Sequence, residues 1–230
     1  MIVTIHQPDF LPWLGFFDRW KRSQRYVVLD DAQFIRRGWQ HRDKIKTPGG
    51  VQWLTLPVQK KGNFTQAIRD VRLEEGLDWR GKHLRTIRSC YGKAPHFERH
   101  FAFLERAYLG GSRFLMEFNL LLLEYAAGVL GIDTPLCLAS TFGSGELRAT
   151  RRLVELTRLA GGDVYLTGVG SRDYLDEAAF RQQGIAVAWQ AFEHPIYPQL
   201  HGPFEPGLSV LDYLMLACPV GSAGEEAPRA

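Results

Sequence analysis

The hydrophobic positions of the chain follow two patterns that alternate along much of its length. Short apolar runs predict buried strands at residues 2–5, 26–29, 136–139, 164–166 and 185–189. Apolar residues three and four apart predict helices from residue 12 onward, over 146–159 and over 174–183. Strands that alternate with helices are typical of a mostly parallel sheet with helices on its faces. The pattern therefore predicts a Rossmann-like α/β fold.

Two parts of the chain depart from this alternation. Residues 51–58 and 68–73 look like two strands on either side of a polar turn at 60–63, which predicts an antiparallel hairpin that extends the sheet. Apolar spacing also predicts three helices, over 79–91, 95–109 and 114–130, and a last helix over 207–216. We expect one α/β domain over residues 1–218, with a helical insertion at about 79–131 and a flexible tail over 219–230.

The first strand carries the strongest functional signal. Its apolar run stops at His6 and Gln7, and Pro8 and Pro12 follow. Proline cannot donate to a sheet ladder, so the chain must turn out of the sheet at this point. His6 and Gln7 are then delivered to the carboxyl end of a strand, which is the edge where open α/β sheets bind ligands.

The second strand also ends in polar residues, Asp30 and Asp31. A right-handed crossover between parallel neighbours places the two carboxyl ends side by side, so these aspartates are expected to face the same crevice as His6. A loop that mixes aromatic and basic residues follows at 33–42 and is expected to hang over that crevice. The proposed shared cavity of His6, the acidic pair and the arginines of this loop is the central prediction.

The candidate catalytic residues are His6, Asp30 and Asp31. His6 could act as a general base or hold a phosphate group, or it could only cap its loop through a backbone hydrogen bond. An aspartate of the pair could orient His6, bind magnesium or receive a proton, or it could bond its own backbone in a turn. Because neighbouring strand residues point to opposite faces, one aspartate of the two is expected to reach the site.

Several turns supply candidate binding residues. The arginines and Trp39 of the 33–42 loop could clamp an anion and stack on a ring, or they could be a solvated charge run. In the turn at 167–171 the glycines could let backbone N–H groups approach an anion, or they could be ordinary glycines of a βα turn. The residues expected to contact substrate are Gln7, Trp13, Gln33, Arg36, Arg37, Trp39, Arg42, Ser140, Thr141, Gly168, Gly170, Ser171 and Tyr174.

Composition narrows the possible classes. The formal net charge of +3 over 230 residues does not by itself imply nucleic-acid binding. Three cysteines with wide spacing form neither a disulfide framework nor a metal knuckle, and no metal site is predicted. No uncharged run is long enough to span a membrane and no basic, then apolar, leader occurs, so we expect a cytoplasmic protein without a membrane partner. The sequence leaves the cofactor and the oligomeric state open.

The motifs together resemble the WbqC-like protein family. The resemblance rests on five blocks of the chain: residues 6–8 with 12–16, 30–34 with Arg37 to Trp39 and Arg42, 89–95, 167–176 and 204–212. The chain departs from the family pattern at Asp43, where asparagine is common, and at 216–218, where an Asn-x-Gly ending is common.

The family resemblance implies a context in the assembly of surface polysaccharides or natural products. It suggests a transferase or ligase that modifies an amino sugar or sugar nucleotide, with amide formation as one candidate reaction and a phosphorylated or nucleotide-linked substrate. The opening strand is also similar to nucleotidyl-transferase folds that activate acids with ATP, although the second histidine of the HxGH motif is missing. A third interpretation is a non-catalytic protein that binds anionic ligands or RNA.

Overall fold

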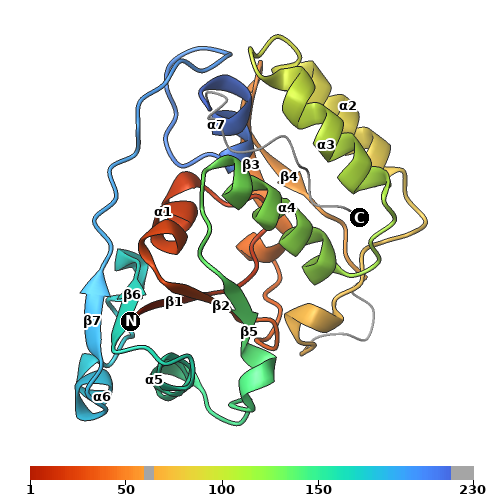
Figure 1. The fold of residues 1–230 in the computed structure, drawn as a ribbon. Coiled ribbons are helices and arrows are strands. Elements are labelled where there is room, and N and C mark those ends of the chain that lie inside the picture. Colours follow the sequence, from red (N-terminus) through yellow and green to blue (C-terminus); the bar gives the residue numbers. More distant parts are fainter. Residues whose placement is uncertain (60–64, 219–230) are drawn as a thin grey trace.

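The structure is a computed structural model that describes residues 1–59 and 65–218. Its central element is a parallel sheet. The sheet in the described residues has five strands in the order β5-β2-β1-β6-β7, and every neighbouring pair is parallel (Figure 1). The strands are β1 (Ile2–His6), β2 (Arg25–Val28), β5 (Leu136–Leu138), β6 (Val164–Thr167) and β7 (Ala186–Trp189). The predicted α/β class is therefore confirmed.

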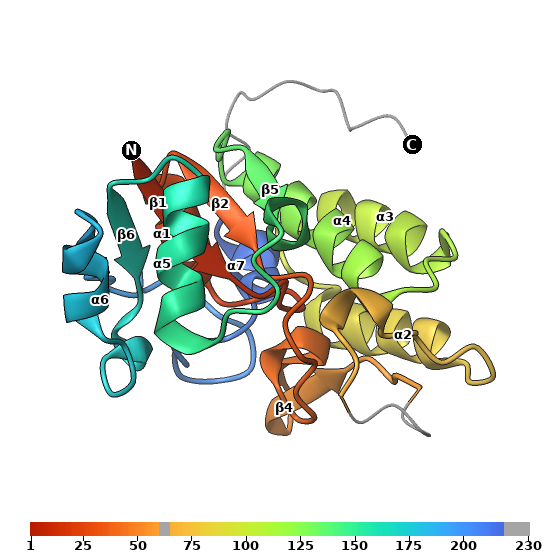
Figure 2. The same ribbon diagram turned by 90° about the horizontal axis from the view of Figure 1, so that it is seen from below.

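Helices cover both faces of this sheet. The helices are α1 (Leu14–Arg22), α2 (Trp79–Tyr91), α3 (Phe97–Leu109), α4 (Leu115–Val129), α5 (Ala149–Leu159), α6 (Glu177–Gln182) and α7 (Val210–Leu216). Side chains of β2 alternate between two cores: Tyr26 and Val28 pack in the cluster that contains α1 and α4, and Val27 packs in the one that contains α5 and α6. Figure 2 shows α5 lying across the sheet on the second face.

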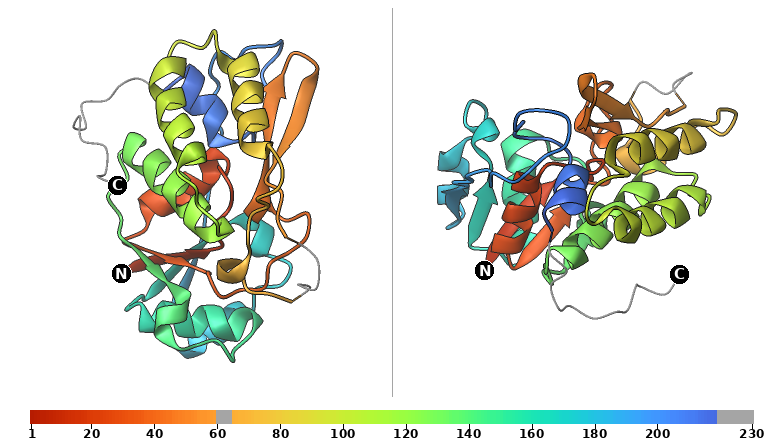
Figure 3. Two further views of the ribbon diagram at one scale, coloured as in Figure 1. Left: turned by 90° about the vertical axis from the view of Figure 1, so that its right-hand side faces the viewer. Right: turned by 90° about the horizontal axis from the view of Figure 1, so that it is seen from above.

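The predicted helical insertion is present as α2, α3 and α4, between the hairpin and β5 in the chain. Its residues Tyr108, Phe118 and Leu122 are fully buried in the same core cluster as the apolar face of α1. Figure 3 shows α2 beside the hairpin, at the end of the molecule away from α5 and α6. Of the helices in the described residues, none is long and apolar enough to cross a bilayer.

The hairpin is present, but only the first of its two predicted strands, at 51–58, overlaps an observed strand. It also forms a separate two-stranded sheet, so the prediction that it extends the main sheet is wrong. The hairpin is formed by β3 (Arg42–Thr47) and β4 (Gly50–Thr55), while residues 68–70 form a 3-10 turn and residues 58 and 73 share only an isolated bridge. The predicted turn at 60–63 lies outside the described residues, as does the predicted tail at 219–230. Strand β3 was missed because its alternate residues 42, 44 and 46 are basic, and of these Lys46 is buried together with the three residues of the other face.

Several helices begin later than predicted, and side-chain caps explain two of the starts. Helix α6 begins at Glu177 because the Asp176 carboxylate accepts hydrogen bonds from the N–H groups of Ala178 and Ala179. Helix α7 begins after Ser209, whose hydroxyl accepts from the Leu211 N–H. Both caps were visible in the sequence as Asp and Ser before an apolar run.

Asn119 of α4 ties the insertion to the loop after β1. The side chain is fully buried, and its Nδ2 donates to the carbonyl oxygens of Pro8 at 2.7 Å and Gln40 at 2.6 Å. These bonds hold the loop that carries His6 against the segment that leads into the hairpin.

Replacing Asn119 should therefore destabilise the protein. The Asn119→Leu variant leaves two buried carbonyl oxygens without a donor, and we expect the free energy of unfolding in urea to fall by about 2–4 kcal/mol. The matched control is Glu124→Leu on the exposed side of the same helix, which should change it by less than about 0.5 kcal/mol. Equal effects of the two variants would contradict this account.

Candidate functional site

A cavity of about 880 Å³, which we call the switch-point cavity, lies where the strand order of the sheet reverses. The chain passes from β1 to β2 and β5 on one side of the sheet and then crosses to β6 and β7 on the other. Ligands bind at such a reversal because the loops that follow the two central strands diverge. The cavity is lined by His6 at the end of β1 and by Thr167 and Gly168 at the end of β6.

His6 enters this cavity as a neutral imidazole. Its Nδ1 lies 3.0 Å from the carbonyl oxygen of Gln7. A carbonyl oxygen only accepts hydrogen bonds, so Nδ1 must carry the hydrogen and Nε2 is the basic nitrogen. No residue in the described ranges bonds to Nε2. Burial, and then the charge of Arg19, lower the pKa of His6 to about 3.

Asp9 is a carboxyl group beside His6 that the sequence interpretation missed. Its Oδ2 lies 3.5 Å from His6 Nδ1, its side chain is buried, and its Oδ1 has no hydrogen-bond partner among the described residues. Burial raises the pKa of Asp9 to about 7, against the opposing effect of Arg19. An aspartate three residues after the histidine, inside a loop fixed by two prolines, was the available signal.

Arg19 of α1 supplies positive charge to the cavity wall. Its guanidinium lies against Gly168, where any Cβ atom would overlap it. A side chain at position 168 would displace the end of this arginine. The predicted backbone contact of Gly168 with an anion stays a prediction. No carboxylate in the described part of the chain forms an ion pair with Arg19.

The start of α5 contributes two more arginines, Arg148 and Arg152. Arg152 is buried, donates through one terminal nitrogen to the Asp31 carboxylate, and leaves its Nε without a partner among the described residues. Ala149 between them has a φ of 48°, a left-handed conformation that costs about 1–3 kcal/mol in a non-glycine residue. Among the described lining residues, three arginines face a single carboxylate, so the cavity favours an anion.

Eight of the predicted site residues line the cavity: His6, Gln7, Asp31, Gln33, Gly168, Gly170, Ser171 and Tyr174. The Tyr174 hydroxyl donates to Ser171 Oγ at 3.0 Å, and Thr167 Oγ1 donates to the same oxygen at 3.2 Å. Tyr174 and Ile35 are mostly exposed at the cavity wall, which gives an otherwise charged cavity an apolar part.

Four predicted residues near the sheet lie outside the cavity wall. Asp30 is buried and accepts a hydrogen bond from the Ser140 N–H at 2.9 Å, so it fastens β2 to the turn after β5. Thr141 donates to the Leu138 carbonyl within the same turn. Trp13 packs edge-on against Phe192. The structure gives these side chains packing and backbone contacts that differ from the predicted contact with substrate.

The arginine loop also lies outside the cavity wall, so the predicted shared cavity is only partly correct. Gln33 reaches the cavity, but Arg36, Arg37, Trp39 and Arg42 do not line it. The central prediction expected their guanidinium groups beside His6. Arg19, Arg148 and Arg152 line the cavity instead, because helices on the two faces of the sheet both direct arginines toward its carboxyl edge.

Comparison with known proteins places the chain in a family. The family model described as "WbqC-like protein family" matches residues 7–222. The chain belongs to the WbqC-like family. It is also similar to a curated relative, "Uncharacterized protein Rv1507c" of Mycobacterium tuberculosis (strain ATCC 25618 / H37Rv), at 36% identity over 228 residues, 98% of this chain and 95% of the relative. No solved structure matches significantly.

Two of the motifs that resemble the WbqC-like family lie at the cavity. The opening motif contains His6 and leads into the loop with Asp9, and the 167–176 block forms the opposite wall. In the described part of this WbqC-like protein, no group of three or more His, Cys, Asp or Glu side chains is placed to hold a metal ion.

The Arg19→Gln variant tests the electrostatics of His6. Removing a positive charge that disfavours the imidazolium should raise the titration midpoint of His6 by about one pH unit from about 3. The midpoint is measured by NMR from the imidazole resonances. The control is Arg22→Gln, one turn away in α1 and bonded to Asp18, which should leave the midpoint unchanged. An unchanged midpoint in both variants would remove Arg19 from the account.

The Asp9→Asn variant tests the raised pKa of Asp9. Between about pH 4.5 and 6.5 the folded protein holds a proton on Asp9 that the unfolded chain has released, so this group stabilises the fold as pH falls. The unfolding free energy of the wild type, relative to the variant, should rise by about 1 kcal/mol per pH unit on acidification. Urea unfolding at several pH values measures this, with exposed Asp133→Asn as control. Parallel profiles for wild type and Asp9→Asn would rule the effect out.

Proposed function

We propose that this WbqC-like protein is a transferase or ligase that acts on an amine-bearing sugar or sugar nucleotide. The observation that supports it is the combination, in one cavity, of a neutral histidine with a free Nε2 and three arginines. A general base and an anion site in one cavity suit transfer to or from a phosphorylated substrate.

The cavity suits an amphipathic ligand. Arg19, Arg148 and Arg152 are placed to bind phosphate oxygens, and Ile35 and Tyr174 offer apolar surface to a ring. A volume of about 880 Å³ lies within the range for sites that bind nucleotide-sized molecules. A nucleoside diphosphate sugar has both the charge and the rings that this wall complements.

His6 would act as the base in amide formation. The amine nitrogen of the acceptor attacks the acyl carbon of an activated donor, a C–N bond forms, and the donor's leaving group departs with the electrons of its bond. The proton that the nitrogen loses passes to His6 Nε2. Asp31, predicted as a catalytic acid or base, is bonded to Arg152 and would instead orient that arginine toward the phosphate.

Substrate binding should strengthen this base. A histidine with a pKa of about 3 is a weak base, and the charge of Arg19 is the second cause of that low value. A phosphate group bound to Arg19 offsets this charge, which raises the pKa of His6 toward neutrality. The base would therefore become stronger when the anionic substrate is in place.

The experiment measures binding of UDP-N-acetylglucosamine, ADP and pyrophosphate by calorimetry, together with the His6 titration by NMR. We expect at least one nucleotide to bind, and the His6 midpoint to rise by about one pH unit in its presence. Arg152→Gln and Arg148→Gln should each weaken binding at least tenfold, because each removes a charged hydrogen bond to phosphate.

The matched control is Arg151→Gln, an exposed neighbour on α5 that does not line the cavity, which should change binding less than twofold. Nucleotide binding that is indifferent to Arg148 and Arg152, or that leaves His6 unchanged, would count against the proposal. If His6→Gln retains full activity once an acceptor is identified, His6 is not the base. Binding of ligands without turnover by the wild type would favour the non-catalytic binding interpretation.

The strand order favours one alternative, ATP-dependent formation of an acyl adenylate. A parallel sheet with its site between β1 and β6 and a histidine at the end of β1 is compatible with such an enzyme. Release of pyrophosphate from ATP on addition of a carboxylic acid distinguishes the alternative, because direct transfer from a preactivated donor releases none.

A further inference from the structure

A second cluster of aromatic and basic side chains lies on the hairpin, outside the cavity wall. We call Trp39, Trp53, Arg42 and Lys44 the cation–indole surface. Lys44 is paired with Trp53 across the hairpin, and Arg42 is paired with Thr55 one step further along, so their side chains share one face. Trp39 joins them from the 3-10 turn before β3, with its ring 5.2 Å from that of Trp53.

Both indoles are exposed to an unusual degree for tryptophan. Trp39 is 48% exposed and Trp53 is 43% exposed. The Arg42 guanidinium lies 4.1 Å above the Trp53 ring, and Lys44 Nζ lies 5.4 Å from Trp53 and 5.9 Å from Trp39. Large rings that stay in contact with water, beside two cations, provide stacking area and positive charge at one place.

The charges of this surface are not neutralised within the described part of the chain, where neither Arg42 nor Lys44 forms an ion pair. Arg42 donates only to the Arg37 carbonyl, and its Nε is buried without a partner. Lys46, the next cation on the same face, is different. It is buried, and its Nζ donates to oxygens of Gln199, Gly202 and Pro203. Of the three cations on this face of the hairpin, Lys46 is therefore bound within the fold, while Arg42 and Lys44 are available to a ligand.

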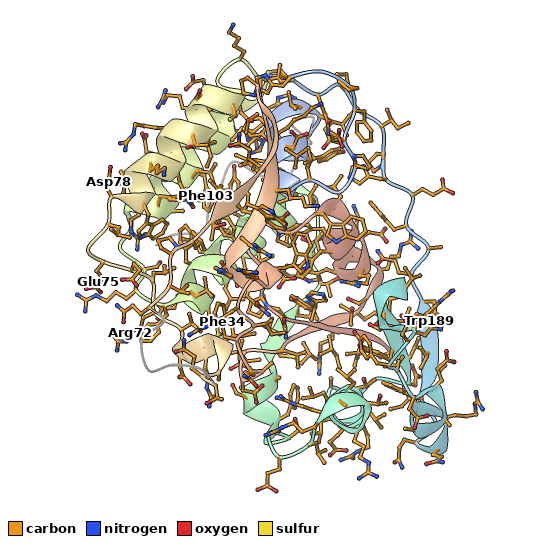
Figure 4. The ribbon with its side chains drawn as sticks, turned by 180° about the vertical axis from the view of Figure 1, so that it is seen from behind. Phe34, Arg72, Glu75, Asp78, Phe103 and Trp189 are labelled. Atoms are coloured by element: carbon orange, nitrogen blue, oxygen red, sulfur yellow. The ribbon has the colours of Figure 1, made fainter. Side chains whose placement is uncertain are left out.

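Space for a ring exists next to Trp53. A cavity of about 600 Å³ lies between the hairpin and the start of α2, lined by Trp53, Thr55, Leu77 and Trp79 among others. Figure 4 shows Asp78, at the start of α2, and Trp189 of β7 on opposite sides of the molecule. Trp53 is the member of the cation–indole surface that lines this cavity, and no residue of the surface or of the cavity lines the switch-point cavity.

We propose that the cation–indole surface is a second binding site, which takes a ring that carries a phosphate or carboxylate group. The ring packs against the exposed indoles, and the anion bonds the free N–H groups of Arg42 and the ammonium of Lys44. An acidic or phosphorylated sugar and a nucleotide share this chemistry. The site does not depend on the function proposed for the switch-point cavity.

The test follows the six indole N–H resonances of the wild-type protein by NMR during ligand addition. The probes are glucose 1-phosphate, glucuronate, UMP, glucose and inorganic phosphate. We expect saturable shifts of the Trp39 and Trp53 resonances, assigned from Trp39→Phe and Trp53→Phe, with either the two acidic sugars or UMP. Glucose and phosphate alone should bind at least tenfold more weakly, because each offers only half of the contact.

Variants then assign the charges. Arg42→Gln and Lys44→Gln should each weaken the shifts of Trp39 and Trp53 at least fivefold. The matched control is Arg88→Gln, which removes a cation 4.3 Å above the buried ring of Phe101 and should have no effect. Arg152→Gln should also leave these two resonances unaffected, so failure here is separate from failure at the switch-point cavity.

Two results would overturn the proposal. One is the absence of any shift of Trp39 or Trp53 with all three anionic ring compounds at 100-fold excess over protein. The other is a response to glucose as strong as the response to glucose 1-phosphate, which would show that the cations take no part. The titration of the wild-type protein is enough to detect the absence of any shift, so this result does not depend on whether a variant folds.

Discussion

The parallel pairing of β1 on both of its edges is the constraint on which the candidate site depends. β1 pairs with β2 through four residues and with β6 through two, and all these strands run in the same direction. Two loops therefore leave the sheet at adjacent positions and must diverge, since one leads to α1 and the other to α6. The cavity fills the space between them. His6 reaches it because it is the last residue of β1.

Burial of charge at this reversal determines the chemistry of the site. Arg19 lowers the pKa of both groups beside it: its charge adds to the effect of burial on His6 and opposes the effect of burial on Asp9. The same burial keeps the imidazole neutral and Asp9 partly protonated near neutral pH. An incoming anion would meet a wall with surplus positive charge and a base whose strength responds to that charge. In the function proposed here, the site would thus couple anion binding to proton transfer.

The hairpin and the helical insertion have different relations to this site. Asn119 in α4 holds the loop after β1 through two backbone carbonyls, so the insertion fixes the position of His6 from a distance. The hairpin carries the arginine and tryptophan residues away from the cavity and displays them at another surface. The family motif therefore divides between two places: Asp31 and Gln33 line the switch-point cavity, and Arg37, Trp39 and Arg42 lie outside its wall.

The sequence by itself determined the elements that depend on local patterns: the α/β alternation, the placement of His6 at a strand end, and the three inserted helices. The spacing of apolar residues and the positions of prolines act on the backbone within a few residues, so their effect can be predicted from the sequence alone. It did not reveal that β3 is a strand, because its basic residues hide the alternation. Which arginines meet His6 was decided only by the tertiary structure. Arg19 and Arg152 lie 133 residues apart in the chain, and the crossing of α1 and α5 over opposite faces of one sheet brings them to the same cavity.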